Sequence, residues 1–402
     1  MENPKIRFKG FTKDWEQRKL GDVCSRVQGN DGRMKLPTLT ISAGNGWMRQ
    51  EDRFSGNIAG NEQKNYTLLH TGELSYNHGN SKLAKYGAVF SLRNYEEALV
   101  PRVYHSFRVE EGCADYIEYY FATKLPDREL RKLISSGARM DGLLNIGYDE
   151  FMGIKMMFPS IKEQNEIATY FRSLDHLITL HQRKCEQTKK LKKYMLQKMF
   201  PQNGAKVPEI RFDGFTYDWE QRKLSELLEK YEDPVETPHD GYERVGIRSH
   251  AKGTFHSFVE PGKELDTAKM YRVAADKFIL NITFAWEHAV AITDNNDAGK
   301  LVSHRFPQFS FNPKLKPHFF KYLMLDKKFR EHLELSSPGG AGRNRVLKIS
   351  DMLKYEIKLP SIEEQIKIGK YFDNLDHLIT LHQRKCDELK KMKKYMLQNM
   401  FI

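Results

Sequence analysis

Histidine and cysteine recur four residues apart in two places in the chain, as His181 with Cys185 and as His382 with Cys386. Residues at this spacing share one face of a helix, and two paired helices could bring the four side chains together to bind zinc. The same positions also fall within a regular apolar repeat, where these side chains would fill a helix–helix seam. We favour the seam, and the sequence predicts no metal site.

Two loops combine arginine with glycine and serine in a way that suits contact with nucleic acid. The segment SSGARMDG carries Arg139, and SSPGGAGRNR carries Arg343, Asn344 and Arg345. Glycine lets a backbone approach phosphates closely, and arginine can donate two hydrogen bonds to a guanine edge. An ordinary surface turn is the alternative for each loop.

Three further clusters are candidate DNA contacts, because asparagine and glutamate can read adenine and cytosine edges and lysine can bind phosphate. The first comprises Tyr76, Asn77, His78, Asn80, Lys82 and Lys85, with an approximate counterpart in Asn281, Trp286, Glu287 and His288. The second, in ERVGIRSHAKG, comprises Arg244, Arg248, His250 and Lys252. The third is the pair His304 and Arg305 in the expected strand VSHRF. Buried strand positions, turns or a solvated hairpin are the alternatives.

Motifs of known catalytic sites are missing from the sequence. There is no GxxxxGK[ST] phosphate loop and no HExxH, GxSxG or GxGxxG motif. The chain also lacks the Pro-Pro pair of an amino-methyltransferase loop, and PDREL at 126–130 lacks the lysine that would follow a nuclease carboxylate pair. We therefore expect no catalytic residue and no cofactor bound by this chain.

Composition narrows the class of protein further. The 402 residues are enough for two or three domains, and 65 Lys plus Arg against 53 Asp plus Glu give a net charge of +12. Such a charge favours a polyanionic partner, most simply nucleic acid. Four scattered cysteines without a CxxC pair predict a reduced, cytoplasmic protein. A membrane span and a secretory signal are not expected, because the chain has no apolar run of about 18 residues and starts with the charged MENPKIRFKG.

The elements that would position these residues are duplicated. PKIRFKGFTKDWEQRKLG at 4–21 and PEIRFDGFTYDWEQRKLS at 208–225 agree at 14 of 18 positions. Residues 158–200 and 359–401 agree at 30 of 43 positions, whereas the stretches between these matching ends have diverged almost completely. Neutral drift after a duplication would erode ends and middles alike. We therefore interpret the middles as one mixed α/β fold that carries two different surfaces.

Local patterns predict elements within the middles. FILNITFAWEHAVAIT at 278–293 is typical of a strand pair, and 116–134 and 318–335 have helical periodicity. Short strands are expected at FMGIKMMFP and MLKYEIKLP, each ended by its proline.

Each of these two strands is followed, after its proline, by a long helix whose apolar positions are alternately four and three residues apart. The first series is Ile167, Phe171, Leu174, Ile178, His181, Cys185, Thr188, Lys192, Met195 and Met199. The second is Ile368, Phe372, Leu375, Ile379, His382, Cys386, Leu389, Lys393, Met396 and Met400. Helices of about 38 residues would be about 57 Å long and should pair, parallel or antiparallel. Their lysine-rich ends suit either solvent or a phosphate backbone.

The chain resembles the specificity subunit of a type I DNA restriction–modification enzyme over almost its whole length. The residues that carry the resemblance are the duplicated RFxGFTxDWEQRKL, PSIxEQxxI, LDHLITLHQRKC and KKYMLQxMF, together with the unlike middles. The resemblance implies an α+β protein in which two pseudo-symmetric α/β target recognition domains are joined by two long helices forming an antiparallel coiled coil. The expected boundaries are 1–160 and 209–360 for the recognition domains, 161–200 and 361–402 for the helices, and 201–208 for a linker.

The resemblance also implies partners. Each recognition domain would read one half of a bipartite site on double-stranded DNA, and the helices would fix the spacer between the halves. Two modification subunits would methylate an adenine in each half-site with S-adenosylmethionine, and two restriction subunits would add ATP- and Mg-dependent translocation and cleavage. The cofactors would belong to the partners. Two other functions remain open from the residues alone: a stand-alone DNA-binding regulator, and a protein-interaction scaffold.

Overall fold

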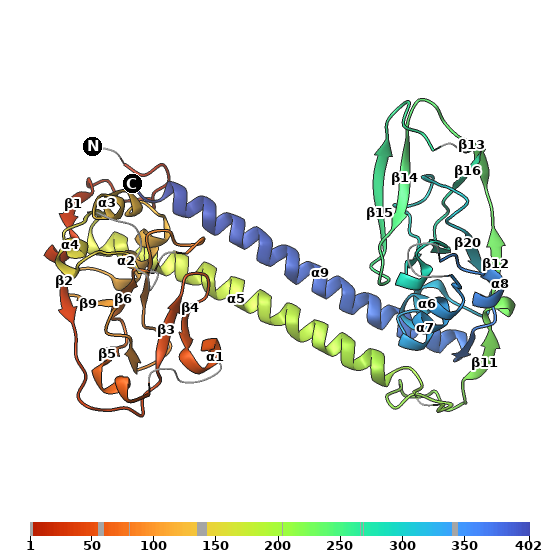
Figure 1. Cartoon of the computed structure of the whole chain (residues 1–402), viewed down its shortest axis with the longest axis horizontal. Helices are drawn as coiled ribbons and strands as arrows, with labels where there is room; N and C mark the ends of the chain where they lie inside the picture. The colour runs from red at the N-terminus through yellow and green to blue at the C-terminus, as the bar shows by residue number, and fades with distance from the viewer. Residues whose placement is uncertain are drawn as a thin grey trace. The chain divides into compact units, whose positions relative to one another are not determined.

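The computed structural model describes residues 3–54, 60–79, 81–134, 143–202, 204–265, 267, 269–339 and 345–402. The chain divides into two compact units, the first built from two stretches of sequence and the second from one. Unit 1 comprises residues 1–182 and 384–402, and unit 2 comprises residues 183–383. Figure 1 colours the chain by residue number, so that the C-terminal stretch can be found beside the N-terminal one in unit 1.

The duplicated start of each unit forms the same short strand pair. β1 (Glu16–Lys19) pairs antiparallel with β10 (Lys155–Phe158), and β11 (Glu220–Lys223) pairs antiparallel with β21 (Glu356–Leu359). Both expected short strands are therefore present. The tryptophan of the repeated motif, Trp15 or Trp219, is buried just before the first strand. Each repeat thus ties the start of its unit to the strand that precedes a long helix.

A four-stranded antiparallel sheet with one topology occurs in both units. In unit 1 its order is β2 (Cys24–Val27), β9 (His105–Val109), β6 (Leu74–Asn77) and β7 (Ala88–Ser91). In unit 2 the order is β12 (Leu228–Tyr231), β20 (Gln308–Phe311), β17 (Phe278–Leu280) and β18 (Val290–Ile292). The strand pair predicted at 278–293 is β17 with β18. The diverged middles therefore share a fold, as the sequence predicts.

A second set of strands carries the main difference between the units. Unit 1 has the hairpin β3 (Leu39–Ser42) with β4 (Gly46–Arg49), and the pair β5 (Thr67–His70) with β8 (Glu97–Val100). Unit 2 has one sheet in the order β13 (Pro234–Glu236), β16 (Lys269–Arg272), β19 (Leu301–Val302), β14 (Tyr242–Ile247) and β15 (Thr254–Val259). A parallel bridge links the hairpin to its neighbour in each unit, at Thr38–Leu99 and at Arg244–Leu301. Unit 2 thus lengthens the hairpin and adds a strand (Figure 1).

Short helices cover the four-stranded sheets. The stretches predicted as helical are each broken in two, as α2 (Ala114–Ala122) and α3 (Asp127–Lys132), and as α6 (Pro317–Leu323) and α7 (Lys327–Leu335). Pro126 and the left-handed Lys124 (φ 69°) interrupt the first stretch, and Asp326 caps the start of α7 by accepting from the Lys328 N–H. The other short helices are α1 (Gln50–Phe54), α4 (Tyr148–Met152), α8 (Ile349–Met352) and the 3-10 turns η1 (Leu20–Asp22), η2 (Gly60–Asn65), η3 (Leu224–Glu226) and η4 (Ala285–Glu287).

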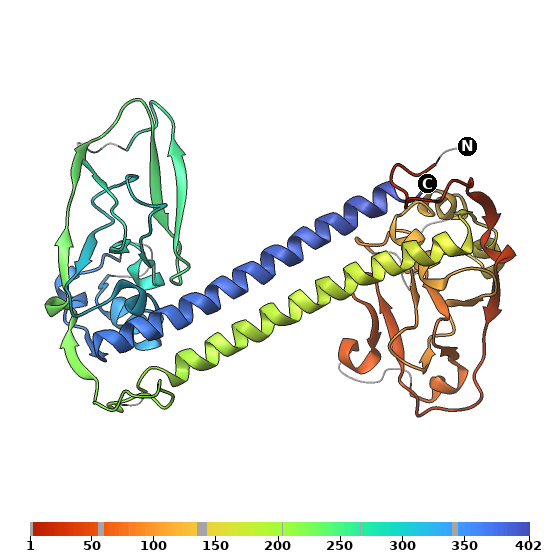
Figure 2. The same cartoon turned by 180° about the vertical axis from the view of Figure 1, so that it is seen from behind.

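The two long helices are α5 (Ile161–Lys198) and α9 (Ile362–Asn399), and Figure 2 shows both as continuous helices. Each unit contains a stretch of both, and in each the numbers rise along α5 as they fall along α9. In unit 1, Asp175 binds Lys393 and Phe171 contacts Phe401. Unit 2 has the corresponding contacts Lys192–Asp376 and Phe200–Phe372. The helices are therefore antiparallel, which resolves the alternative that the periodicity left open.

The predicted seam is largely buried. Its buried members are Ile167, Phe171, Leu174, Ile178 and Cys185 on α5 with Met199 just after it, and Ile368, Phe372, Leu375, Cys386 and Leu389 on α9 with Met400 just after it. Because Ile167 and Phe372 belong to the cores that also hold the tryptophans of the repeats, the helices are part of each unit's hydrophobic core. Among the described helices, none combines the length and apolar character that crossing a membrane requires.

Candidate nucleic-acid interface

The β14–β15 turn of unit 2, residues 248–253, presents three exposed basic side chains: Arg248, His250 and Lys252. His250 and Ala251 both adopt left-handed backbone conformations, with φ of 62° and 51°. Non-glycine residues rarely adopt this conformation, so the turn must be held by its surroundings. Arg248 donates from its guanidinium to the Thr254 carbonyl and stacks over the Phe255 ring, 5.3 Å from the centroid, which fixes the side chain at the hairpin end.

The surroundings that hold this turn are the residues of η4. The His250 N–H donates to the Glu287 carbonyl over 2.9 Å, and the Ala251 N–H donates to the His288 carbonyl over 2.8 Å. The Ser249 hydroxyl donates to the Glu287 carboxylate at 2.6 Å. The hairpin turn and η4 therefore form one surface, although the bonded residues are 37 or 38 positions apart in the sequence.

Arg345 joins the same surface from a third segment. Its guanidinium lies 5.5 Å from the centre of the Trp286 ring, and the indole N–H of Trp286 donates to the Thr283 carbonyl at 3.1 Å. Two residues further on, the Leu347 N–H donates to the Ile282 carbonyl. We call Arg248, His250, Lys252, Trp286, Glu287 and Arg345 the tip of unit 2.

Unit 1 builds the corresponding surface with different residues. The turn between β6 and β7 presents the exposed side chains of Lys82, Leu83 and Lys85, and Leu83 is 71% exposed. A Cβ added to Gly44 in the β3–β4 turn would lie 3.1 Å from Leu83 Cδ1, so the hairpin turn and the β6–β7 turn are neighbours here too. We call Lys82, Leu83, Lys85 and the turn 43–45 the tip of unit 1.

Asparagine sets the start of the turn beside each tip. The Asn77 amide oxygen accepts from the Gly79 N–H, and the Asn281 amide oxygen accepts from the Thr283 N–H, both at 3.0 Å. These side chains shape the turns, and Asn77 also donates to the Ile41 carbonyl. In unit 1 the segment before α4 also contacts this turn, because the Leu144 N–H donates to the His78 carbonyl at 2.8 Å.

Three predicted DNA contacts lie in the protein core, and for these the prediction is wrong. Tyr76 is fully buried, stacks on Phe151 with ring centres 4.3 Å apart, and donates to the Tyr86 carbonyl. Both ring nitrogens of the buried His78 face carbonyl oxygens, at 2.7 and 2.9 Å. His288 Nε2 lies 2.9 Å from the Met324 carbonyl oxygen, and burial lowers the pKa of its ring. None of the three can reach a base edge.

The remaining predicted residues divide by where they lie. His304 and Arg305 are exposed, but they lie in a turn after β19 and not in the strand that VSHRF predicts. Arg244 is half-buried within β14. Asn80, Arg139, Arg343 and Asn344 lie outside the described residues.

Some exposed side chains at these surfaces escape prediction from the sequence. Besides Leu83 they include Phe255 on β15, beside the hairpin turn, whereas the exposed Phe258 lies at the other end of that strand. The Phe255 ring covers Gly246 of the partner strand, where an added Cβ would lie 2.3 Å from the ring. A glycine opposite an aromatic residue in a predicted hairpin is the signal that could have identified Phe255.

The cysteines of the two histidine–cysteine pairs are buried in the seam between the long helices. Cys185 Sγ lies 3.8 Å from the Ile379 carbonyl oxygen and from the Gln383 amide oxygen, and Cys386 is buried in the core of unit 1. Within the part of the chain that the structure describes, no three His, Cys, Asp or Glu side chains are grouped so that they could hold a metal ion.

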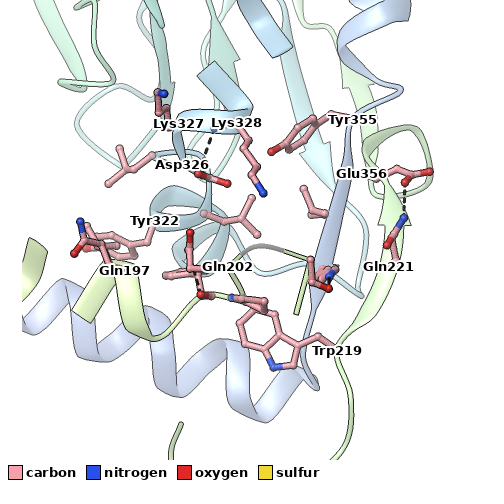
Figure 3. A pocket seen from close by; sticks show the side chains of 18 residues that line it. Gln197, Gln202, Trp219, Gln221, Tyr322, Asp326, Lys327, Lys328, Tyr355 and Glu356 are labelled. Atoms are coloured by element: carbon pink, nitrogen blue, oxygen red, sulfur yellow. Dashed lines mark hydrogen bonds between the residues drawn. The ribbon is translucent and has the colours of Figure 1, made fainter. Parts of the chain in front are cut away.

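A cavity of about 590 Å³ lies in unit 2, built from elements other than its tip. Its walls include Phe200, Trp219, Tyr322 and Leu323, and Figure 3 shows Gln221 hydrogen-bonded to Glu356 at its edge. Asp326 and Lys328 also line the cavity, but Asp326 caps α7 and so has a structural partner. The cavity is mixed in polarity, and its walls come partly from the repeated segments, at Phe200 and Trp219, and partly from the diverged middle of unit 2.

The duplicated frame and the two unlike tips define a class of protein with paired recognition modules. The family described as the Type I restriction modification DNA specificity domain matches this chain twice, over residues 12–190 and 217–391. The chain therefore belongs to this family, and it is a specificity subunit of a type I restriction–modification system.

Two relatives from Methanocaldococcus jannaschii are similar to the chain. The type I restriction enzyme MjaVIII specificity subunit is 23% identical over 300 residues, which are 70% of this chain and 68% of that protein. The putative type I restriction enzyme MjaX specificity subunit is 26% identical over 297 residues, 70% of this chain and 66% of that protein.

A solved structure shares the fold. The type I restriction–modification system S subunit from M. genitalium aligns with 100% of this chain and 99% of its own, with a TM-score of 0.59 and 13% sequence identity. At this identity the likeness concerns the fold alone.

Proposed function

We propose that the chain directs a type I restriction–modification complex to a bipartite site on double-stranded DNA, with each tip reading one half-site. The observation that carries this proposal is the difference between two tips of the same construction. Lys82 and Lys85 flank an exposed leucine in unit 1, whereas arginines accompany Trp286 in unit 2. Arginine reads guanine edges, lysine binds phosphate, and an apolar side chain contacts the thymine methyl group.

The proposed DNA contacts are the exposed and half-buried members of the predicted set. They are Asn77, Lys82, Lys85, Arg244, Arg248, His250, Lys252, Trp286, His304, Arg305 and Arg345. The proposal also keeps Arg139, together with Asn80, Arg343 and Asn344, which adjoin tip residues in sequence. Tyr76, His78 and His288 are left out because they are buried.

Two modification subunits would dock on the long helices. Supporting this stoichiometry, α5 and α9 each expose apolar side chains at three matching positions outside the seam. They are Leu177, Leu191 and Tyr194 on α5, and Leu378, Met392 and Tyr395 on α9. Exposed apolar side chains in a row on a helix suit a partner helix. Because the row occurs twice, we infer two equivalent partners.

The reactions would take place on the partners. Each modification subunit would methylate an adenine in its half-site with S-adenosylmethionine, and two restriction subunits would use ATP and Mg for translocation and cleavage. In this division of labour the chain itself supplies binding and spacing. We propose that the chain functions in the cytoplasm. We also propose that its recognition domains span residues 1–160 and 209–360.

Mapping of methylated adenines tests the proposal. The chain is co-expressed with its modification subunit in a host without adenine methylation, and all modified positions are sequenced. We expect one motif with two short half-sites around a fixed number of unspecified bases. A soluble complex that modifies no adenine would overturn the proposal. Specific DNA binding by the chain without its partner would then support a stand-alone regulator.

A further inference from the structure

Three side chains from three different elements form a closed cluster in unit 1. The Tyr119 hydroxyl on α2 donates to Asp175 Oδ2 on α5 at 2.9 Å. The other oxygen of the same carboxylate binds the Lys393 ammonium of α9 at 2.5 Å. Lys393 also lies over the Tyr119 ring, 5.3 Å from its centre. One carboxylate therefore holds a helix of the α/β domain against both long helices.

Unit 2 repeats this cluster with the roles of the long helices exchanged. The Tyr322 hydroxyl on α6 lies 2.8 Å from Asp376 Oδ2 on α9, and 2.7 Å from Oδ1 of Asp373 on the same helix. Asp376 Oδ1 binds the Lys192 ammonium of α5 at 2.5 Å, and Lys192 lies 5.1 Å from the centre of the Tyr322 ring. The same three residue types thus make the same three contacts in both units, while the middles around them have diverged.

The clusters are well suited to hold a fixed geometry. Both tyrosines are only 2% exposed, and the lysines are 24% and 19% exposed at their side chains. Burial raises the pKa of Tyr119 and of Tyr322, so each hydroxyl remains a hydrogen-bond donor. A charge-assisted hydrogen bond of this kind is short and directional, in contrast to an apolar contact, which allows sliding.

A short chain of contacts runs from each cluster to the tip of the same unit. In unit 2, the Met324 carbonyl lies two residues after Tyr322 and meets the ring of His288, which adjoins Glu287 of the tip. In unit 1, Glu118 precedes Tyr119 on α2 and accepts from the Ser91 N–H of β7 at 2.7 Å. β7 forms the arm of the turn that carries Lys82 and Lys85.

We propose that these two clusters, Tyr119–Asp175–Lys393 and Tyr322–Asp376–Lys192, are positioning devices that set the register of each tip relative to the paired helices and thereby restrict the complex to one spacer length. The inference rests on the proposed function, because register has meaning only if both tips read DNA. A reader that can shift on its helices would accept half-sites one base pair, about 3.4 Å, nearer or farther.

The experiment measures methylation of a set of DNA sites that differ only in spacer length. The half-sites found with the unaltered chain are placed with spacers one base shorter, equal and one base longer. Complexes contain the full chain with its modification subunits. The variants are Tyr119→Phe and Lys393→Met in unit 1, and Tyr322→Phe and Lys192→Met in unit 2. The matched controls are Tyr217→Phe, whose ring is 87% exposed, and Lys394→Met, the exposed neighbour of Lys393.

We expect the methylation at the wrong spacers, relative to the right one, to rise about tenfold in each cluster variant and further when both units are altered. The controls should keep the unaltered profile. A lower melting temperature with an unchanged spacer profile would show that the clusters only stabilise the fold, and would overturn the proposal. An unchanged profile with unchanged stability would overturn it as well. If the unaltered complex methylates no site, the proposed function fails before the spacer set is used.

Discussion

The guanidinium of Arg7 and the carboxylate of Glu163 form a two-point ion pair, with N–O distances of 2.7 and 2.8 Å, although 156 residues separate them. Arg211 and Glu364 repeat it in unit 2, with both distances at 2.7 Å. Glu163 is 1% exposed and Glu364 is fully buried. The arginine of each RFxGF motif thus fastens the start of a unit to the first turn of its long helix.

Replacing Arg7 by alanine should destabilise unit 1 by about 3 kcal/mol, because the buried Glu163 would lose its partner. Denaturant unfolding followed by circular dichroism, with the Trp15 region monitored by fluorescence, measures the loss. Arg222→Ala is the control. Because Arg222 pairs with glutamates on the surface, this variant should lower the free energy of unfolding by less than about 1 kcal/mol. Equal losses for the two variants would contradict the role given to the buried pair.

The frame of the molecule could be predicted from the sequence because its signals are periodic or repeated. The alternating spacing of four and three residues marks the helix seam. The duplicated motif PSIxEQ contains a glutamine that has the same structural role in both units. Gln164 accepts from the Cys113 N–H at the start of α2, and Gln365 accepts from the Lys316 N–H at the start of α6. Each glutamine thus seats a domain helix on its long helix.

The face on which a polar residue lies could not be predicted. Their residue types predict that Tyr76 and His78 contact DNA, but both side chains are buried, and Tyr76 stacks on Phe151 of α4. The exposed Leu83 was missed because leucine predicts a core position. The break between α2 and α3 was within reach of prediction, because Pro126 cannot continue a helix.

The buried position of Tyr76 has a direct test. Tyr76→Phe removes one hydrogen bond, to the Tyr86 carbonyl, and should lower stability by about 1 kcal/mol. The methylated sequence should not change, because the ring never reaches the surface. Sequencing of methylated adenines and thermal unfolding are the two measurements. A changed half-site would restore Tyr76 to the set of DNA contacts.

Stability should fall as the pH drops below about 6.5, the ordinary histidine value. Burial lowers the pKa of His105 in unit 1 and of His288 in unit 2, so both rings favour the neutral form when folded. The unfolded chain then binds more protons, and protonation below about pH 6.5 favours unfolding. The stability that these neutral rings provide is fully present above about pH 6.5, and it is lost as the pH falls toward their lowered pKa values in the folded state.

Melting temperatures at pH 7.5 and 5.5 measure this effect. His105→Gln should reduce the difference between the two temperatures, because glutamine does not titrate. His176→Gln, at an exposed position of α5, serves as the control and should keep the full difference. Comparing variants with the unaltered chain removes the contribution of other titrating groups. If His105→Gln leaves the difference unchanged, His105 does not contribute to the pH dependence.

Arg345 and Lys82 should affect DNA binding in different ways. Arg345 stacks on Trp286 in the tip of unit 2, where its guanidinium can read a base. Arg345→Ala should cost about 1–3 kcal/mol and relax one base position in a single half-site. Lys82→Ala in unit 1 should weaken binding to all sequences alike and reduce the slope of log affinity against log salt by about 0.9, the effect of one phosphate contact.

Titrations of the complex with the modification subunits, at several salt concentrations, separate these two outcomes. Lys327→Ala is the control because its side chain is 86% exposed and lies outside the tip. Because each variant lies in one unit, the half-site that changes identifies the unit that reads it. If Arg345→Ala weakened all sequences equally, Arg345 would be a phosphate contact, and base reading by unit 2 would have to come from the other proposed contacts, such as Arg248.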